Sequence, residues 1–581
     1  MERCGQVDPA CPAAAGQSLI RTAAVFLLLV SCAVRMLGQT SAGEDPALVQ
    51  VRRLFDQGNW QEIVSLVRSI PAPSAELDYY YGTALARLNR WQEAHDAFAT
   101  GARLQPGDKR FPLELAGVAF KQRKYPQAAA YLRRALELDP SDPYANDFLA
   151  TVYFLQSNLE AALKYWNRVD KPRVEAVRAE PVPRVRPEVL DRALAFSPAS
   201  ILRLPELSTS ETRVRGLGIF PSYHFDLQAR DDGKFDVVFR NRERNGWGSS
   251  TWEALFLVFR GLPFQAVYPE FFNLKHEAIN ITSLFRWDAE KRRAFASLSA
   301  PLARNPKWRY GLNVDLRSEN WDIRDSFTGP APLLGSLNLR REAVGAQLTS
   351  FESGRWTWSV GVELSHRDFR SVIPGVALTP GLLAKGHQLK QVTQVDAALW
   401  RIPERRLSLD GEVSSQVGRI WSQPGHGFLK LQGSARWHWF PRPEGDDYEV
   451  QQQVRVGKTF GDAPFDELFM LGLERDNDLP MRAHIGTRDG RKGSAPLGGT
   501  YFLSNWEADK NIFQNGLLTV KLGPFVDTGK ITDTSSGLGS RKWLWDVGAQ
   551  AKARVFGVGV VFSYGKDLRS GNNAYYVTML R

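Results

Sequence analysis

The feature that most constrains the fold is a two-residue hydrophobic period that recurs through residues 248–581. Successive side chains of a β-strand point to opposite faces, so each such segment is expected to form a strand with one apolar and one polar face. Repetition in segments of about ten residues is typical of a transmembrane β-barrel, here of about 16 strands. A secreted soluble β-sandwich or propeller is the alternative. The clearest apolar sets are Trp308, Tyr310, Leu312, Val314 and Leu316; Trp356, Trp358, Val360, Val362 and Leu364; Leu429, Leu431, Ala435, Trp437 and Trp439; and Val558, Val560, Phe562 and Tyr564.

The placement of tryptophan agrees with a barrel. Fourteen of the 17 Trp residues lie at or after position 247, and aromatic side chains gather at the strand ends of membrane barrels. The mean hydropathy is −0.31, and no run beyond the N-terminus approaches 18 apolar residues, so helical membrane spans are not predicted. A barrel is compatible with this value because its lumen-facing residues are polar.

A 34-residue repeat organises residues 46–170, with a degenerate first copy before the others. Its pattern resembles the tetratricopeptide repeat, in which small residues let two antiparallel helices approach, a large residue fills the gap and a proline ends the second helix. An unrelated helical bundle is the alternative. The resemblance implies a concave surface that holds a peptide or partner protein. The matching positions are Gly82, Ala94, Phe98 and Pro106, then Ala128, Leu132 and Pro140, then Ala162 and Trp166.

Residues 171–247 are expected to form a linker and a small α/β module. Residues 171–187 are rich in Pro, Arg and Val, and read as a linker or a first edge strand. Next come a helix ending near residues 216–218, strands at 223–229 and 235–240, and an Asp-Gly turn at 232–233, which is a strong hairpin signal. The order helix, Leu-Gly-Ile-Phe (217–220), hairpin resembles a POTRA domain, a periplasmic module placed before barrels. The resemblance implies an exposed strand edge that captures client chains.

The last third of the chain carries the most specific motifs. Residues 479–484 read Leu-Pro-Met-Arg-Ala-His, residues 496–502 read Pro-Leu-Gly-Gly-Thr-Tyr-Phe, and residues 525–529 read Phe-Val-Asp-Thr-Gly. This order resembles the Omp85 superfamily, the BamA/TamA-like or bacterial surface antigen barrels. In that family an Arg-Gly-aromatic motif on a lumen loop pairs with the aspartate of a Phe-x-Asp-x-Gly strand. The residues implied here are the lumen-loop pair Arg482 and Asp527, supported by Phe525, Gly529, Gly498 and Gly499.

The chain departs from the Omp85 pattern at three points. Ala483 stands where the family has glycine, His484 stands where it has Phe or Tyr, and the C-terminus lacks a terminal aromatic residue. The pairing of Arg482 with Asp527 follows from the resemblance, and a confined guanidinium does need a carboxylate partner. Two unrelated charges on separate loops are the alternative.

Residues 1–40 are expected to be an export signal. A short apolar run at 23–34 follows Arg21, which suits a signal peptide better than a membrane span or a buried helix. Cys32 lies in a lipobox-like context, so lipidation is the alternative to ordinary cleavage. All three cysteines, Cys4, Cys11 and Cys32, lie in this segment, and a cysteine-free mature chain suits an oxidising compartment.

No motif in the sequence predicts an enzyme, a cofactor or a metal site. There is no nucleophile elbow, P-loop or Rossmann glycine pattern, and the eight histidines have no ligand spacing. The net charge of +11 is spread along the chain, so nucleic acid is not an expected partner.

The expected function is therefore an outer-membrane Omp85-type protein that inserts or translocates other proteins, with its N-terminal region in the periplasm. Its expected partners are outer-membrane lipid and client proteins. An export porin, a structural barrel that docks a polysaccharide or lipoprotein machine, and a lipid-processing enzyme are the alternatives.

Overall fold

The computed structural model describes residues 45–324, 332–373, 375, 378–421, 425–442, 447–515, 518–532, 538, 540–555 and 558–580. The expected export signal and Cys32 lie outside these residues. No helix within the described ranges is long and apolar enough to cross a membrane. The chain divides into two compact units, residues 1–140 and 141–581.

The described part of the first unit is an array of antiparallel helix pairs that share one core. Val51, Ile63, Leu85 and Phe111 are fully buried in it. Each helix alone exposes an apolar stripe, so stacking of neighbouring pairs is what buries the core. The helices are α2 (Pro46–Asp56), α3 (Trp60–Arg68), α4 (Ala75–Arg87), α5 (Trp91–Leu104), α6 (Arg110–Lys121) and α7 (Tyr125–Leu138).

The residues predicted to pack the repeats lie at the contacts between paired helices. Phe98 on α5 is fully buried, and a Cβ built on Gly82 of α4 would lie 2.6 Å from its ring. Glycine is therefore required at position 82 for the two helices to approach this closely. Ala94 and Ala128 are likewise fully buried.

Asp78 on α4 is a buried carboxyl group in this array. It is 3% exposed, and its Oδ2 has no hydrogen-bond partner within the described residues. Burial raises the pKa of Asp78 from 3.8 to about 6, because desolvation disfavours the charged form. Between about pH 4 and 6, the folded array therefore holds a proton on Asp78 that the unfolded chain releases.

We expect Asp78→Asn to stabilise the array at neutral pH. The pKa of Asp78 is higher in the folded than in the unfolded chain. Its contribution to the free energy of unfolding is therefore complete below about pH 4 and is lost as the pH rises through about 6. The variant should raise the free energy of unfolding by about 1–3 kcal/mol at pH 7.5 and by little at pH 4. Hydrogen exchange of α4 in the full chain, at both pH values, measures this. An equal gain at pH 4 would contradict the assignment.

The second unit opens with one further helix pair and a three-stranded module. The stretch expected as a linker or edge strand contains a strand, β1 (Val174–Glu180), which pairs in parallel with β3 (Phe235–Arg242). β3 also pairs with β2 (Ser222–Ala229) in an antiparallel hairpin, giving the order β1-β3-β2. The helices are α8 (Pro143–Leu155), α9 (Leu159–Trp166), α10 (Pro187–Ala193) and α11 (Leu204–Leu217), with η1 at Asn167–Val169.

Helix α11 ends where the sequence predicts. Gly218 follows it with a φ of 69°, a left-handed conformation that favours glycine. A Cβ at this position would lie 3.0 Å from the Asn280 side chain. Arg309 Nη1 donates hydrogen bonds to the carbonyls of Gly216 (2.8 Å) and Leu217 (2.9 Å), so the barrel sheet supports the helix end.

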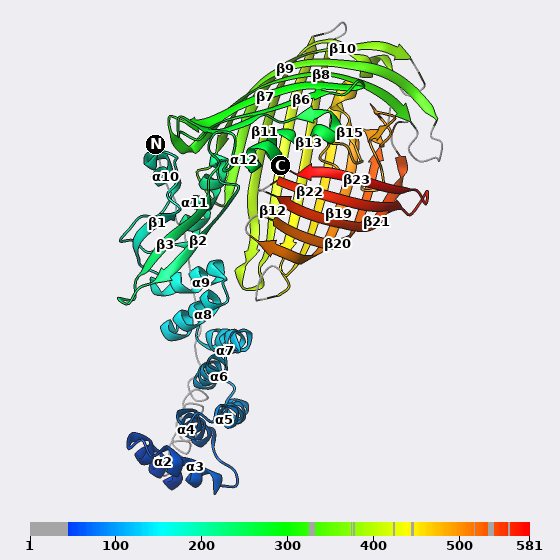
Figure 1. The fold of residues 1–581 in the computed structure, drawn as a ribbon. Coiled ribbons are helices and arrows are strands. Elements are labelled where there is room, and N and C mark those ends of the chain that lie inside the picture. The colour runs from blue at the N-terminus through cyan, green and yellow to red at the C-terminus, as the bar shows by residue number, and fades with distance from the viewer. Residues whose placement is uncertain are drawn as a thin grey trace, which may run out of the picture. The chain divides into compact units, whose positions relative to one another are not determined.

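The rest of the chain is a large antiparallel sheet that curls into a barrel (Figure 1). This confirms the predicted order of a helical array followed by a large antiparallel sheet. Helix α12 (Thr251–Phe259) and η2 (Leu262–Phe264) precede it. The wall strands are β4 (Ala266–Val267), β5 (Glu270–Leu274), β6 (Ile279–Trp287), β7 (Lys291–Leu302), β8 (Asn305–Arg324), β9 (Leu333–Ser350), β10 (Trp356–Ile373), β11 (Gly386–Ile402), β12 (Leu407–Trp421), β13 (His426–Trp439), β14 (Tyr448–Gly461), β19 (Thr500–Asn515), β20 (Leu518–Thr532), β21 (Ser540–Val555), β22 (Val558–Asp567) and β23 (Asn573–Leu580), with η3 at Pro380–Leu383 and η4 at Pro403–Arg405.

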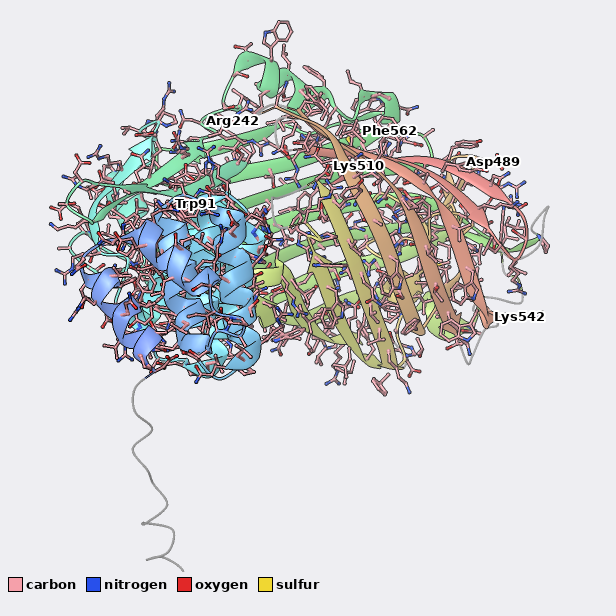
Figure 2. All side chains as sticks on the ribbon, turned by 90° about the horizontal axis from the view of Figure 1, so that it is seen from below. Trp91, Arg242, Asp489, Lys510, Lys542 and Phe562 are labelled. Atoms are coloured by element: carbon pink, nitrogen blue, oxygen red, sulfur yellow. The ribbon has the colours of Figure 1, made fainter. Side chains whose placement is uncertain are left out.

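The outer face of the barrel is apolar and the inner face is charged. On β8, Leu312, Val314 and Leu316 are 43–48% exposed, whereas Asp315 between them is 9% exposed. Phe562, labelled in Figure 2, is another outward-facing residue. A soluble sandwich or propeller would place its apolar face inside, so this arrangement argues against that alternative and fits a lipid-facing wall.

The two ends of the wall meet at β4 and β23. Antiparallel registers run in sequence from β6 to β23, with β14 paired to β19. β23 is the neighbour of β4 around the barrel. Leu257 of α12 packs against Phe272 of β5 and Val558 of β22, which places this helix where the ends meet. Because β4 and β5 are short pieces that both pair with β6, the expected number of about 16 strands stays a prediction.

The last helix pair contacts the turn between β11 and β12. Asn158 Nδ2 donates a hydrogen bond to the carbonyl of Pro403 at 2.8 Å. The Glu404 carboxylate accepts from Lys164 Nζ at 2.5 Å and from Tyr165 Oη at 2.8 Å. The turn therefore has both a neutral and a charged contact with α9 and the residue before it.

Candidate functional site: a loop in the barrel lumen

The connection between β14 and β19, residues 462–499, folds back into the barrel. Its strand β15 pairs with its own β18, and β17 pairs in parallel with β8 through Lys492 and Trp321. Leu471 and Met481 are fully buried, with Leu503 and Leu544 of the wall in the same apolar cluster. The segment is thus a packed part of the lumen. Its short elements are η5 (Phe465–Glu467), β15 (Phe469–Met470), β16 (Thr487–Arg488), β17 (Arg491–Lys492) and β18 (Leu497–Gly498).

Arg482 and Asp527, the pair predicted from the Omp85 resemblance, lie in direct contact. Arg482 Nε donates to Asp527 Oδ2 at 2.9 Å, Nη2 donates to Oδ1, and the Arg482 backbone N–H donates to Oδ2 at 3.0 Å. Asp527 is fully buried and Arg482 is 5% exposed. This planar, two-pronged contact fixes both the position and the orientation of the guanidinium.

Further wall residues complete the surroundings of this pair. Arg482 Nη1 donates to Glu507 at 2.6 Å and to Gln550 at 2.7 Å, and Asn505 Nδ2 donates to Asp527 at 2.6 Å. The guanidinium carbon lies 3.8 Å from the centre of the Phe525 ring, which gives that motif residue a cation–π role. Glu507, Gln550 and Asn505 were not predicted; their only sequence signal is their inward register on strands β19 and β21.

The predicted glycines differ in what they do. A Cβ on Gly529 would lie 2.9 Å from Met481 Sδ, and one on Gly498 would lie 2.6 Å from the Thr532 carbonyl. Both positions therefore need a small residue. Gly499 has open space around it, so packing does not explain that residue. Gly565, which was not predicted, lies against the loop backbone, since a Cβ there would be 2.5 Å from the Arg482 carbonyl.

A second ionic group, also missed by sequence analysis, ties the loop to the first strands of the wall. Asp476 of the loop pairs with Arg293 at 2.6 Å and with Arg286 at 3.3 Å. Lys492 pairs with Glu319 at 2.8 Å and with Asp476 at 3.4 Å. These partners lie on β6, β7 and β8, so the loop contacts wall strands on both sides of the place where β4 and β23 meet.

A third group lies at the start of the loop. Glu467 accepts from Lys390 Nζ at 3.0 Å, and Asp466 lies 3.3 Å from the fully buried Arg367. Arg341 pairs with Asp466 at 3.5 Å. The loop therefore has ionic contacts with strands β9 to β11 as well as with β6–β8 and β19–β21, so charge pairs hold it to three stretches of the wall.

The two departures from the Omp85 motif are accommodated locally. The φ of Ala483 is not positive, so its backbone does not require glycine. Its N–H donates a hydrogen bond to Asp546 Oδ2 at 2.7 Å. His484, in place of an aromatic residue, is 5% exposed and its Nδ1 lies 3.1 Å from the same Asp546 oxygen. The polar contact between His484 and Asp546 therefore stands where the resemblance implies an aromatic side chain.

The fold and the loop thus define an antiparallel β-barrel with a loop-filled lumen, preceded by a three-stranded module and helical repeats. The tetratricopeptide repeat family matches residues 79–143 and 113–172, which confirms that prediction. No curated protein matches the chain. CdiB from Escherichia coli, a solved structure, is similar over 71% of this chain and 75% of its own, with 14% identity and a TM-score of 0.44. BamA from Haemophilus ducreyi lacking POTRA domains 1-3 is similar over 70% and 84%, with 11% identity and a TM-score of 0.40.

Proposed function

We propose that this chain is an Omp85-type outer-membrane protein that inserts or translocates other proteins. The observation that carries the proposal is the lumen loop held by Arg482 and Asp527, which is the feature that the family motifs imply. An apolar outer wall with a charged interior supports placement in an outer membrane. No covalent chemistry is required, because strand pairing and burial of apolar surface supply the work.

In this proposal the segments before the barrel handle clients on the periplasmic side. The β1-α10-α11-β2-β3 module is a POTRA-like domain, with β1 and β2 as its sheet edges. An unpaired strand edge can add a client strand through main-chain hydrogen bonds. The repeats offer a second surface for a client or a partner protein. The proposed limits are residues 46–170 for the repeats, 171–247 for the linker and module, and 248–581 for the barrel.

The test compares the detergent-solubilised full chain with a variant lacking residues 46–170. Proteins that co-purify with the full chain are identified after crosslinking in the native membrane. We expect outer-membrane or exported proteins that are lost when the repeats are deleted, while the barrel keeps its heat-modifiable gel mobility. Clients that are retained without the repeats would contradict the recruiting role.

An export porin is the second candidate, and conductance distinguishes it. The ionic contacts with β6–β8 and with β19–β21 hold the loop inside the lumen, where it obstructs the path of ions, so we expect small, unstable currents in planar bilayers. Arg482→Ala should increase them, since the loop loses a tether. A wide, stable, voltage-insensitive pore in the unmodified protein would favour the porin and contradict the proposed function.

A further inference from the structure

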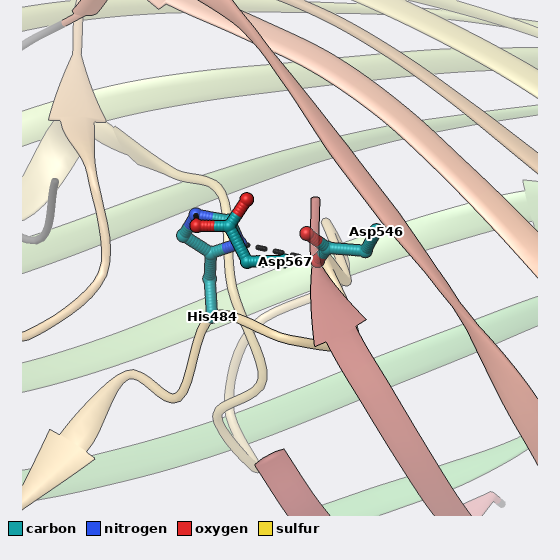
Figure 3. A group of neighbouring side chains, drawn as sticks. All are labelled: His484, Asp546 and Asp567. Atoms are coloured by element: carbon teal, nitrogen blue, oxygen red, sulfur yellow. Dashed lines mark hydrogen bonds and ion pairs between the residues drawn. The ribbon is translucent and has the colours of Figure 1, made fainter. Parts of the chain in front are cut away.

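Three side chains that are distant in sequence form a buried group beside the lumen loop. His484 comes from the loop, Asp546 from β21, and Asp567 from the end of β22 (Figure 3). One ligand atom from each lies within 4.8 Å of the others, and all three residues are buried. His484 Nδ1 lies 3.1 Å from Asp546 Oδ2, and Nε2 lies 3.8 Å from Asp567 Oδ2. One imidazole is thus shared between two carboxylates.

Two polar atoms of this group have no hydrogen-bond partner within the described residues. They are His484 Nε2, on a side chain that is 4% exposed, and Asp546 Oδ1, on a side chain that is fully buried. A buried nitrogen or oxygen without a partner is costly and is rare in proteins. Both atoms belong to residue types that bind metal ions, and a cation bound between them would be a partner for both.

The hydrogen bonds already present would orient the imidazole for a metal ion. The contact of Nδ1 with the Asp546 carboxylate holds the ring so that Nε2 faces Asp567. Asp567 is itself fixed, because it accepts from the backbone N–H groups of Arg569 (2.9 Å) and Ser570 (3.3 Å) in the following turn.

The charge of the group also fits a divalent cation. With a neutral imidazole, two buried carboxylates share this site, and a doubly charged ion balances them. Imidazole nitrogen with carboxylate oxygen is a ligand set that Zn²⁺ accepts at about 2.0–2.2 Å. Two such ligands lie at most about 4.4 Å apart, so binding requires the group to contract by a few tenths of an ångström.

We propose that His484, Asp546 and Asp567 form a binding site for a divalent transition-metal cation, with Zn²⁺ as the probe. The ion would join the loop to β21 and to the turn after β22, next to the Arg482–Asp527 contact. This gives the loop a second, metal-dependent tether, and it does not depend on the proposed function of the barrel.

The test measures Zn²⁺ binding to the detergent-purified full chain after removal of metal with a chelator. We expect one Zn²⁺ per chain at micromolar free metal. His484→Phe should abolish this binding, and Asp567→Asn should weaken it at least tenfold. Phenylalanine is the residue type of the related motif at position 484, so this variant is expected to fold, and heat-modifiable gel mobility checks each barrel.

A matched control removes a competing pair of imidazoles. His366 and His387 lie opposite each other on β10 and β11, with ring centres 4.6 Å apart on the exposed face. His366→Ala combined with His387→Ala should leave the binding unchanged. Zn²⁺ should also slow protease cleavage within residues 471–499 of the unmodified chain, and have no such effect on His484→Phe.

Three results would overturn the site. They are no Zn²⁺ binding by the unmodified chain at micromolar free metal, binding that persists in His484→Phe, and binding that disappears with the exposed His366–His387 pair. Normal Zn²⁺ binding by a full chain with which no client protein co-purifies would instead count against the proposed function alone.

Discussion

Replacing Arg482 with alanine is expected to release the lumen loop and to lower the stability of the barrel. The change removes the hydrogen bonds from the guanidinium to the fully buried Asp527 and leaves that carboxylate without a cation in this contact. Removing one partner of a buried ion pair costs about 3–5 kcal/mol, because the remaining charge stays desolvated. The loss should lower the temperature at which heat-modifiable gel mobility disappears, and should speed protease cleavage within residues 471–499.

The matched control is Arg488→Ala. Arg488 lies on the same loop, but its side chain is 49% exposed and pairs with Asp489 only at 4.0 Å. This variant should behave like the unmodified protein, since exposed ion pairs contribute little.

Asp527→Ala should be about as harmful as Arg482→Ala, both to loop protection and to the surface level of any client. The double variant should cost less than the sum of the two single changes, because it leaves no unpaired member of the pair. Purely additive losses, or unchanged client levels in both single variants, would contradict the role of this pair as a loop tether.

The second large effect is expected in the repeats, where Phe98→Ala should open the α4–α5 pair. Phe98 is fully buried and lies against the position of Gly82. A Phe→Ala change in a core costs about 3–5 kcal/mol through lost burial and the cavity that remains. Amide hydrogen exchange of α4 and α5 in the full chain should accelerate by roughly two to three orders of magnitude, at about 1.4 kcal/mol per factor of ten.

Leu104→Ala is the control for this measurement. Leu104 ends the same helix but is 56% exposed, so its truncation removes little buried surface. Exchange in the barrel strands should be unchanged in both variants. If Phe98→Ala leaves the exchange of α4 unaltered, Phe98 is not a central packing residue of the array.

Much of the architecture follows from local patterns. The period of two on β8 predicts which side chains face outward, because a strand offers only two faces. The 34-residue interval that places Gly82, Ala94 and Phe98 predicts the helix pairs, because each repeat must bury the same contact. Gly218 ends α11 because its left-handed backbone is suited to glycine.

The pairing of Arg482 with Asp527 was accessible only through a resemblance. Nothing in their spacing of 45 residues brings them together, and their contact depends on where the loop crosses the lumen. The partners Glu507, Gln550 and Asn505 were missed for the same reason. An inward-facing polar residue on a barrel strand is common, and its partner is set by the neighbouring strand or the loop.

The histidines show this limit most clearly. Read along the chain they have no ligand spacing, and His484 is only a departure from a motif. In the folded chain, the register of β21 and β22 places Asp546 directly opposite Asp567, and the loop inserts His484 between them.

The sequence alone determined the alternating wall, the repeats and the order of the modules, since these depend on local periodicity. Only the tertiary structure decided how the lumen is filled and which charges meet there, because those contacts arise from strand register and loop path across long sequence separations.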